Sequence, residues 1–193
     1  SSSTRKVVKI VPKFYSANNP ASGKDLEGNT VSFSATTNSG GYRLKDGTFP
    51  ENSYASVYDS SKSTCKDDGV YENFEADHIE SSDLNDGWDA AGVSAISNVK
   101  KTYEYYLSVH GRNSFDDQGA PLVSVINEPC SEYINNASWA GNTMYYGAGN
   151  GLQNFAIALD VASHEVTHGV IQHSSNLEYE DQSGALNESF ADI

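Results

Sequence analysis

Residues 152–172 constrain the fold most, because apolar residues recur along this segment every three or four positions. Phe155, Leu159, Ala162, Val166 and Val170 would share one stripe of an α-helix. Such a stripe has to be buried against the rest of the chain. The sequence therefore predicts a long helix that packs on a core.

Most of the chain before this helix is β-rich by pattern. Short apolar runs predict strands at residues 7–11, 31–35 and 122–126. Residues 135–151 are rich in Asn, Gly and Tyr and fit a loop or an edge strand. Strands early in the chain and helices later indicate an α+β fold, with a β-rich N-terminal lobe followed by long helices.

Two further helices are predicted. Residues 88–110 carry apolar side chains at helical spacing and end at Gly111. Ser183 is suited to be the N-cap of a last helix, whose apolar residues fall at 186, 190 and 193. No capping Gly or Asn follows this helix. We therefore expect residues 1–173 to form the β-rich lobe with its long helix, and residues 174–193 to begin a truncated helical C-terminal lobe.

The charge of the chain excludes two classes of partner. It has 26 Asp and Glu against 12 Lys and Arg, a formal net charge of −14 over 193 residues. Nucleic acids and anionic membrane surfaces are bound by clustered cations, so we expect neither as a partner. No apolar run approaches the roughly 20 residues of a membrane span. Twelve Tyr, seven Phe and two Trp indicate a folded rather than a disordered chain.

The chain contains two cysteines, Cys65 and Cys130. In an acidic sequence rich in Tyr, Asn, Ser and Gly, one such pair favours a disulfide formed in an oxidising compartment. The alternative is two free thiols in a cytosolic protein. A zinc site made from them is not expected, because neither belongs to a C-x-x-C pair.

The long helix carries His164 and His168 four residues apart, with Glu165 directly after the first. Residues at this spacing lie on one face of a helix, so both imidazoles can bind one metal ion. Neutral imidazole is a strong zinc ligand, and a carboxylate beside it can take a proton from a zinc-bound water. The alternative is a surface helix that carries two unrelated histidines.

A second pair of acidic residues, Glu188 and Asp192, lies on the last predicted helix, again four apart. The 20 residues between His168 and Glu188 allow one helix to end and another to pack back on it. Glu188 can then be a third zinc ligand, and Asp192 can accept the N–H of a ligating histidine. The alternative is a solvated acidic face.

Several separated motifs together resemble the thermolysin-like neutral metallopeptidases. The resemblance is carried by residues 160–193, which contain His164-Glu165-Val166-Thr167-His168 and later Gly184-Ala185-Leu186-Asn187-Glu188. Further similar segments are residues 103–106, 111–114, 135–139 and 144–147. The resemblance runs from about residue 86 to the end of the chain and is weak in the first 85 residues.

This resemblance implies roles for the helix residues. His164, His168 and Glu188 would bind one catalytic zinc ion, and Glu165 would be the catalytic base. Asp192 would orient His164. The resemblance also implies a zincin fold and a structural calcium ion.

Four further residues match positions with known roles in the family. Asn136 and Ala137 would hold the backbone of an extended peptide substrate by strand addition. Tyr179 would help to stabilise the oxyanion, its alternative being an ordinary half-buried loop tyrosine. Asp160 would be a calcium ligand, its alternative being an exposed acid that the helix dipole favours at a helix start.

The sequence therefore predicts a secreted zinc metalloendopeptidase, made as a zymogen and monomeric, that hydrolyses peptide or protein substrates. Its partner would be the missing C-terminal half of the catalytic unit, because the family's later half supplies a histidine that neither His110 nor His173 matches. The alternative is a non-catalytic zinc-binding fragment or module. A β-rich adhesion or carbohydrate-binding domain with accidental histidines is a third possibility.

Overall fold

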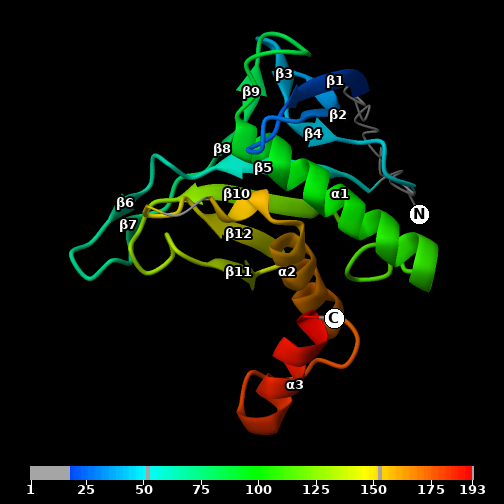
Figure 1. Cartoon of the computed structure of the whole chain (residues 1–193), viewed down its shortest axis with the longest axis vertical. Coiled ribbons are helices and arrows are strands. Elements are labelled where there is room, and N and C mark those ends of the chain that lie inside the picture. Colours follow the sequence, from blue (N-terminus) through cyan, green and yellow to red (C-terminus); the bar gives the residue numbers. More distant parts are fainter. Residues whose placement is uncertain (1–17, 51–52, 152–153, 193) are drawn as a thin grey trace, which may run out of the picture.

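The computed structural model describes residues 18–50, 53–151 and 154–192. The predicted strand at residues 7–11 lies outside them. The described residues form a four-stranded antiparallel sheet, a larger mixed sheet, a two-stranded hairpin and three α-helices (Figure 1). None of the described helices combines the length and the apolar character that crossing a membrane requires.

The antiparallel sheet has the order β1-β2-β3-β9, and the mixed sheet has the order β11-β12-β10-β5-β4, with β8 also paired to β5. The strands of the first sheet are β1 (Asn18–Lys24), β2 (Thr30–Thr37), β3 (Tyr42–Arg43) and β9 (Glu80–Ser81). Those of the mixed sheet are β4 (Lys45–Asp46), β5 (Ala55–Asp59), β8 (Asp77–His78), β10 (Leu122–Glu128), β11 (Ala137–Ala140) and β12 (Thr143–Gly147).

The direction of the strands determines which edge of the mixed sheet is open. β10 runs parallel to both β5 and β12, and parallel neighbours require a crossover connection. β11 pairs with β12 in antiparallel fashion and is the last strand of the sheet. Among the described residues, the outer backbone groups of β11 are therefore available to pair with another extended chain.

α1 (Ala90–His110) is the helix of the crossover between β5 and β10 (Figure 1). Its start is fixed by Asp89, whose side chain accepts the N–H of Gly92 at 2.9 Å. It ends at Gly111, whose φ of 63° suits a residue without a side chain. The predicted helix at residues 88–110 is thus confirmed, and its buried face includes Val93, Ile96 and Val99.

α2 (Leu159–Gln172) begins later than predicted, so the expected helix start at residue 152 is wrong. Residues 152 and 153 lie outside the described part, and Asn154 accepts the N–H of Ala156 to cap a separate 3-10 helix, Phe155–Ile157. Ala158 then adopts an extended backbone with ψ of 123°. Regular helical geometry starts only after this extended residue.

α2 is fixed between α1 and the edge strand. The hydroxyl of Tyr106 on α1 lies 2.7 Å from the hydroxyl of Thr167 on α2. On the other side, Gly169 meets the ring of Trp139 in β11 so closely that an added Cβ would lie 2.5 Å from it. The indole N–H of Trp139 also donates to Gln172 at 2.8 Å. The lack of a side chain at Gly169 therefore lets the edge strand lie directly against the helix.

α3 (Asp181–Ala191) packs back on α2, at the end of the molecule remote from β1–β3 (Figure 1). It begins three residues earlier than predicted, because Glu180 is the extended N-cap residue and Gly184 donates its N–H to the Glu180 carbonyl at 3.0 Å. The prediction of Ser183 as N-cap is therefore wrong. Leu186 and Phe190 on this helix are exposed.

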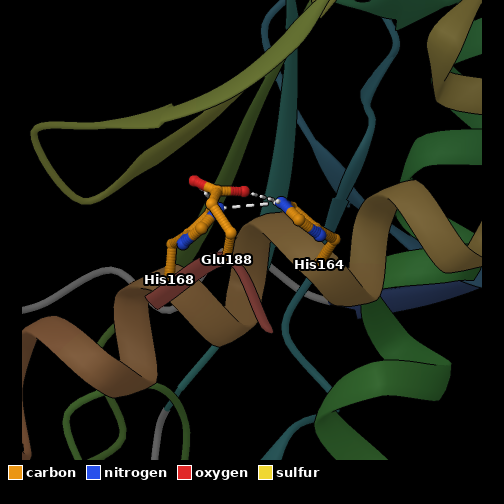
Figure 2. Close-up of side chains that lie close together, drawn as sticks. All are labelled: His164, His168 and Glu188. Atoms are coloured by element: carbon orange, nitrogen blue, oxygen red, sulfur yellow. Dashed lines mark hydrogen bonds and ion pairs between the residues drawn. The ribbon is translucent and has the colours of Figure 1, made fainter. Parts of the chain in front are cut away.

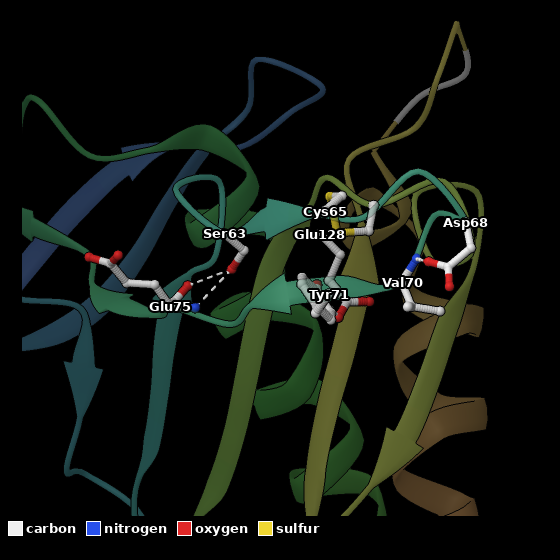
Figure 3. The surroundings of a disulfide bond; sticks show 8 residues. Ser63, Cys65, Asp68, Val70, Tyr71, Glu75 and Glu128 are labelled. Carbon is white, nitrogen blue, oxygen red and sulfur yellow. Dashed lines mark hydrogen bonds between the residues drawn. A yellow bond between two sulfur atoms is a disulfide. The ribbon is translucent and has the colours of Figure 1, made fainter.

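The two cysteines form a disulfide that joins a hairpin to the segment just after β10 (Figure 3). The hairpin consists of β6 (Thr64–Cys65) and β7 (Tyr71–Asn73). Tyr71 donates its hydroxyl to the buried carboxylate of Glu128 at 2.8 Å, and its ring stacks on that of Tyr133. The disulfide and these contacts anchor the hairpin just before the turn that leads into β11.

Candidate metal centre and cleft

His164 and His168 occupy successive turns of α2, and α3 brings Glu188 against them (Figure 2). The two Nε2 atoms are 2.8 Å apart. The Glu188 carboxylate lies 3.3 Å from Nε2 of His164 and 3.7 Å from Nε2 of His168. One ligand atom from each of the three residues thus falls within 4.8 Å of the others.

The opposite ring nitrogens of both histidines are held by acceptors on α3 and on the residue that directly follows it. Nδ1 of His164 lies 2.8 Å from Oδ1 of Asp192, and Nδ1 of His168 lies 2.8 Å from Oδ1 of Asn187. Asn187 donates its amide N–H to the carbonyl of Leu177, which fixes its oxygen toward the imidazole. Because carboxylate and amide oxygens only accept, each Nδ1 carries the proton.

With its one ring proton on Nδ1, each imidazole has a lone pair on Nε2. Two lone pairs facing each other at 2.8 Å, beside a carboxylate, repel unless a cation lies between them. Imidazole nitrogen and carboxylate oxygen are ligands of zinc, and two histidines with one glutamate leave a fourth position open. The donor set therefore fits a zinc ion with one exchangeable site.

Glu165 is buried next to these residues, with 5% of its surface exposed. Burial raises the pKa of Glu165 to about 7, and the nearby charge of Glu188 adds to this. His164 and the backbone N–H of Trp139 act in the opposite direction on the same pKa. The carboxyl group is thus shielded from bulk solvent and close to the metal-type ligands.

A cavity of about 880 Å³ lies beside the histidines and extends to the edge strand. Its lining includes most of the predicted site residues: Asn136, Ala137, Asp160, His164, Glu165 and Asp192. Apolar side chains of Phe155, Leu159 and Val161 also line it. The cavity thus joins the carboxyl group of Glu165 to the open edge of the sheet.

Tyr179 and Asp160 are less closely associated with the metal-type ligands. The ring of Tyr179 lies 5.6 Å from that of His168, measured between centroids, but the side chain is largely exposed at 61%. The carboxylate of Asp160 accepts the N–H of Val161 in the first turn of α2. In the part of the chain that the structure describes, Asp160 belongs to no group of three metal-type side chains.

Asn187 is a residue of this site that was not predicted from the sequence. Its position next to Glu188 places it on α3, but asparagine is common on helix surfaces for many reasons. Only the folded structure shows that its side chain is buried and reaches across to His168. Its position directly before a candidate ligand is the one sequence signal that could have indicated this role.

Comparison with known protein families shows to which family the chain belongs. The family model described as "Thermolysin metallopeptidase, catalytic domain" matches residues 20–172, which include His164, Glu165 and His168. The chain belongs to the thermolysin metallopeptidase family. This confirms the family resemblance predicted from the sequence. Glu188 and Asp192 lie beyond the matched residues.

Curated relatives extend this similarity over nearly the whole chain. The chain is 38% identical to the extracellular elastase of Staphylococcus epidermidis, over 98% of this chain and 37% of that protein. It is 36% identical to bacillolysin of Bacillus amyloliquefaciens, over 98% of this chain and 36% of that protein. The chain thus spans little more than a third of the length of these thermolysin-family relatives.

A solved structure in the family has the same fold. The precursor of protealysin, a metalloproteinase from Serratia proteamaculans, superposes with a TM-score of 0.55 at 32% identity. The superposition covers 71% of this chain and 40% of that one. The predicted α+β fold of the thermolysin type is therefore confirmed.

Proposed function

We propose that this chain provides the zinc-binding and substrate-binding part of a secreted metalloendopeptidase. The observation that carries the proposal is the convergence of two histidine Nε2 atoms and the Glu188 carboxylate beside the buried Glu165. A catalytic rather than a structural zinc site fits this donor set, because three protein ligands leave one position open. Bound zinc would polarise a peptide carbonyl and lower the pKa of water.

The residues of the site have defined roles in this proposal. Asp192 and Asn187 hold the two imidazoles in the tautomer that binds metal through Nε2. Glu165 accepts a proton from the attacking water and donates one to the leaving amine, since its carboxyl group lines the cavity. Tyr179 is a candidate for a hydrogen bond to the oxyanion.

The edge strand would orient the substrate. Asn136 and Ala137 line the cavity at the start of β11, so an extended peptide added to this edge would lie along the metal-binding face of α2. Backbone hydrogen bonds would supply the affinity, and the apolar lining of the cavity would select side chains. We therefore propose peptides or proteins as substrates.

Secretion and calcium binding are supported by relationship rather than by geometry. The relative from Staphylococcus epidermidis is named an extracellular elastase, and the disulfide fits an oxidising compartment. Calcium takes six to eight oxygen ligands, so Asp160 could supply only a small part of such a site.

The zinc and base assignments are tested with Glu165→Gln and the matched variant Glu104→Gln, which changes an exposed glutamate on α1. Bound zinc is measured for both variants of this chain, and peptidase activity for both after the chain is joined to the proposed C-terminal half of the catalytic unit. We expect Glu165→Gln to retain zinc and to lose about 10²- to 10⁴-fold in kcat. Glu104→Gln should behave as the unmodified protein.

Two results would contradict the proposal. Unchanged kcat in Glu165→Gln would remove the base from the mechanism. Stoichiometric zinc in a protein that cleaves no peptide even when this chain is joined to the proposed C-terminal half of the catalytic unit would favour a non-catalytic zinc-binding module instead.

A further inference from the structure

A second cavity, of about 340 Å³, lies on the mixed sheet away from the metal centre. Tyr54, Tyr58, Lys45 and His78 line it from β4, β5, β8 and the residue before β5. In the strand order, β10 and β12 separate this end of the sheet from β11 (Figure 1). The cavity is therefore distinct from the cleft described above.

Side chains alternate along β4 and β5, and this alternation places polar groups on the face of the mixed sheet where the cavity lies. Leu44 and Val57 are buried, and Leu44 contacts α1 at Gly92. Because successive side chains of a strand point to opposite faces, Lys45 and Tyr58 lie on the other face of the sheet. His78 is directly opposite Tyr58 in the register, and their rings lie 4.2 Å apart.

Lys45 lies against an aromatic ring and not against a carboxylate. Lys62 and Lys100, in contrast, pair with Asp77 and Asp46 at 2.6 and 3.2 Å. Lys45 has no carboxylate partner among the described residues. Its Nζ instead lies 3.8 Å from the centre of the Tyr54 ring.

The electrostatic environment of Lys45 agrees with this geometry. Burial lowers the pKa of Lys45, and the positive charge of Arg43 lowers it further. A partly buried cation next to another cation is stabilised by any anion that enters the cavity. An anion in the cavity would therefore favour the charged form of Lys45.

Two further basic side chains, Arg43 and His78, line the same cavity. Nδ1 of His78 is buried and makes no hydrogen bond to the residues that the structure describes. Arg43 donates from Nε to Glu80 at 2.9 Å, while its remaining N–H groups have no partner in the described chain. An unpaired buried nitrogen is costly, so a small turn of the His78 ring that lets a ligand accept from Nδ1 would increase the affinity of that ligand.

We propose that this cavity binds a small oxyanion, a carboxylate or a phosphate group, with Lys45 as its charged ligand and His78 and Arg43 as hydrogen-bond donors. The hydroxyl groups of Thr36, Thr37 and Ser39 also line the cavity and suit the polar body of such a molecule. The volume is larger than one phosphate ion requires, so the ligand class is an organic acid or a phosphate ester.

The test measures binding of inorganic phosphate and of acetate to the whole protein by NMR titration, at constant ionic strength maintained with chloride. Both anions can also bind zinc, so only the part of the response that depends on Lys45 is counted. Lys45→Met removes the charge, and Lys101→Met is the matched control on the exposed face of α1.

We expect saturable shifts in the unmodified protein and in Lys101→Met, and affinity at least about 10-fold lower in Lys45→Met. His78→Phe keeps a ring against Tyr58 but loses the donor, so it should also weaken binding and provides a second variant if Lys45→Met does not fold. A response to phosphate alone identifies a phosphate ester as the ligand class, and a response to acetate identifies a carboxylate.

Two outcomes overturn the proposal. One is the absence of saturable binding by either anion, which would also result if another segment of the chain fills the cavity. The other is equal affinity in Lys45→Met, His78→Phe and the unmodified protein. Neither outcome bears on the metal centre, because the variants lie outside it.

Discussion

The disulfide between Cys65 and Cys130 should supply a large part of the stability of this chain. The two residues are 65 positions apart, and one lies in the hairpin while the other lies just after β10. Cross-linking a loop of this length removes conformational entropy from the unfolded state worth about 4 kcal/mol at 25 °C. The free energy of unfolding of ordinary domains is only about 5–15 kcal/mol.

The perturbation is the double variant Cys65→Ser and Cys130→Ser, compared with the oxidised protein by urea denaturation and circular dichroism. With a slope of about 2 kcal/mol per molar urea, the loss of 4 kcal/mol lowers the midpoint by about 2 M. The folded structure should persist at low urea, because Tyr71 still bonds to Glu128 and stacks on Tyr133.

The oxidised protein treated with a reductant is the matched control, and its midpoint should agree with that of the double variant. A midpoint lowered by less than about 0.5 M would refute the entropy reasoning, since the constraint on the unfolded chain would then be negligible. A change confined to the slope would instead indicate that the unfolded ensemble had become more or less compact.

Two other substitutions probe contacts around α2. Asn187→Leu should lower zinc affinity by about 10- to 100-fold in a chelator competition, because Nδ1 of His168 loses its acceptor; unchanged affinity would contradict a positioning role. Gly169→Ala should lower the free energy of unfolding by about 1–3 kcal/mol in thermal denaturation, although alanine favours helices, because its Cβ meets the Trp139 ring. Adding Trp139→Leu to Gly169→Ala should recover part of this loss, and no recovery would show that the ring is not the obstacle.

The parts of the fold that the sequence predicted are those with strong local signals. α1 has an apolar stripe of several turns, Asp89 as a capping residue and Gly111 at its end, and all three act within a few residues. The predicted start of α2 was wrong because the signals that decide where a helix starts are also local. Phe155 fits the helical stripe, but the side chain of Asn154 caps a short 3-10 helix and a new start is needed after Ala158.

The candidate site likewise contains features that the sequence could predict and features that it could not. The proximity of His164 and His168 follows from helix geometry alone, and only the position of Glu188 depends on how α3 folds back. The bond from His168 to Asn187 depends on side-chain conformations across two helices, which no periodicity encodes. The cavity around Lys45 was not predictable, because β4 and β8 have two residues each and are too short for a pattern to indicate them.

The parallel pairing of β5 and β10 has a consequence for how the chain folds. Residues 60–121 separate these strands, so the centre of the mixed sheet can form only after a long loop closes. The three metal-type ligands, in contrast, lie between residues 164 and 188 and can approach one another early. The slow step of folding is therefore expected in the formation of the sheet. The metal-type ligands can come together before β11 has joined the sheet as its edge strand.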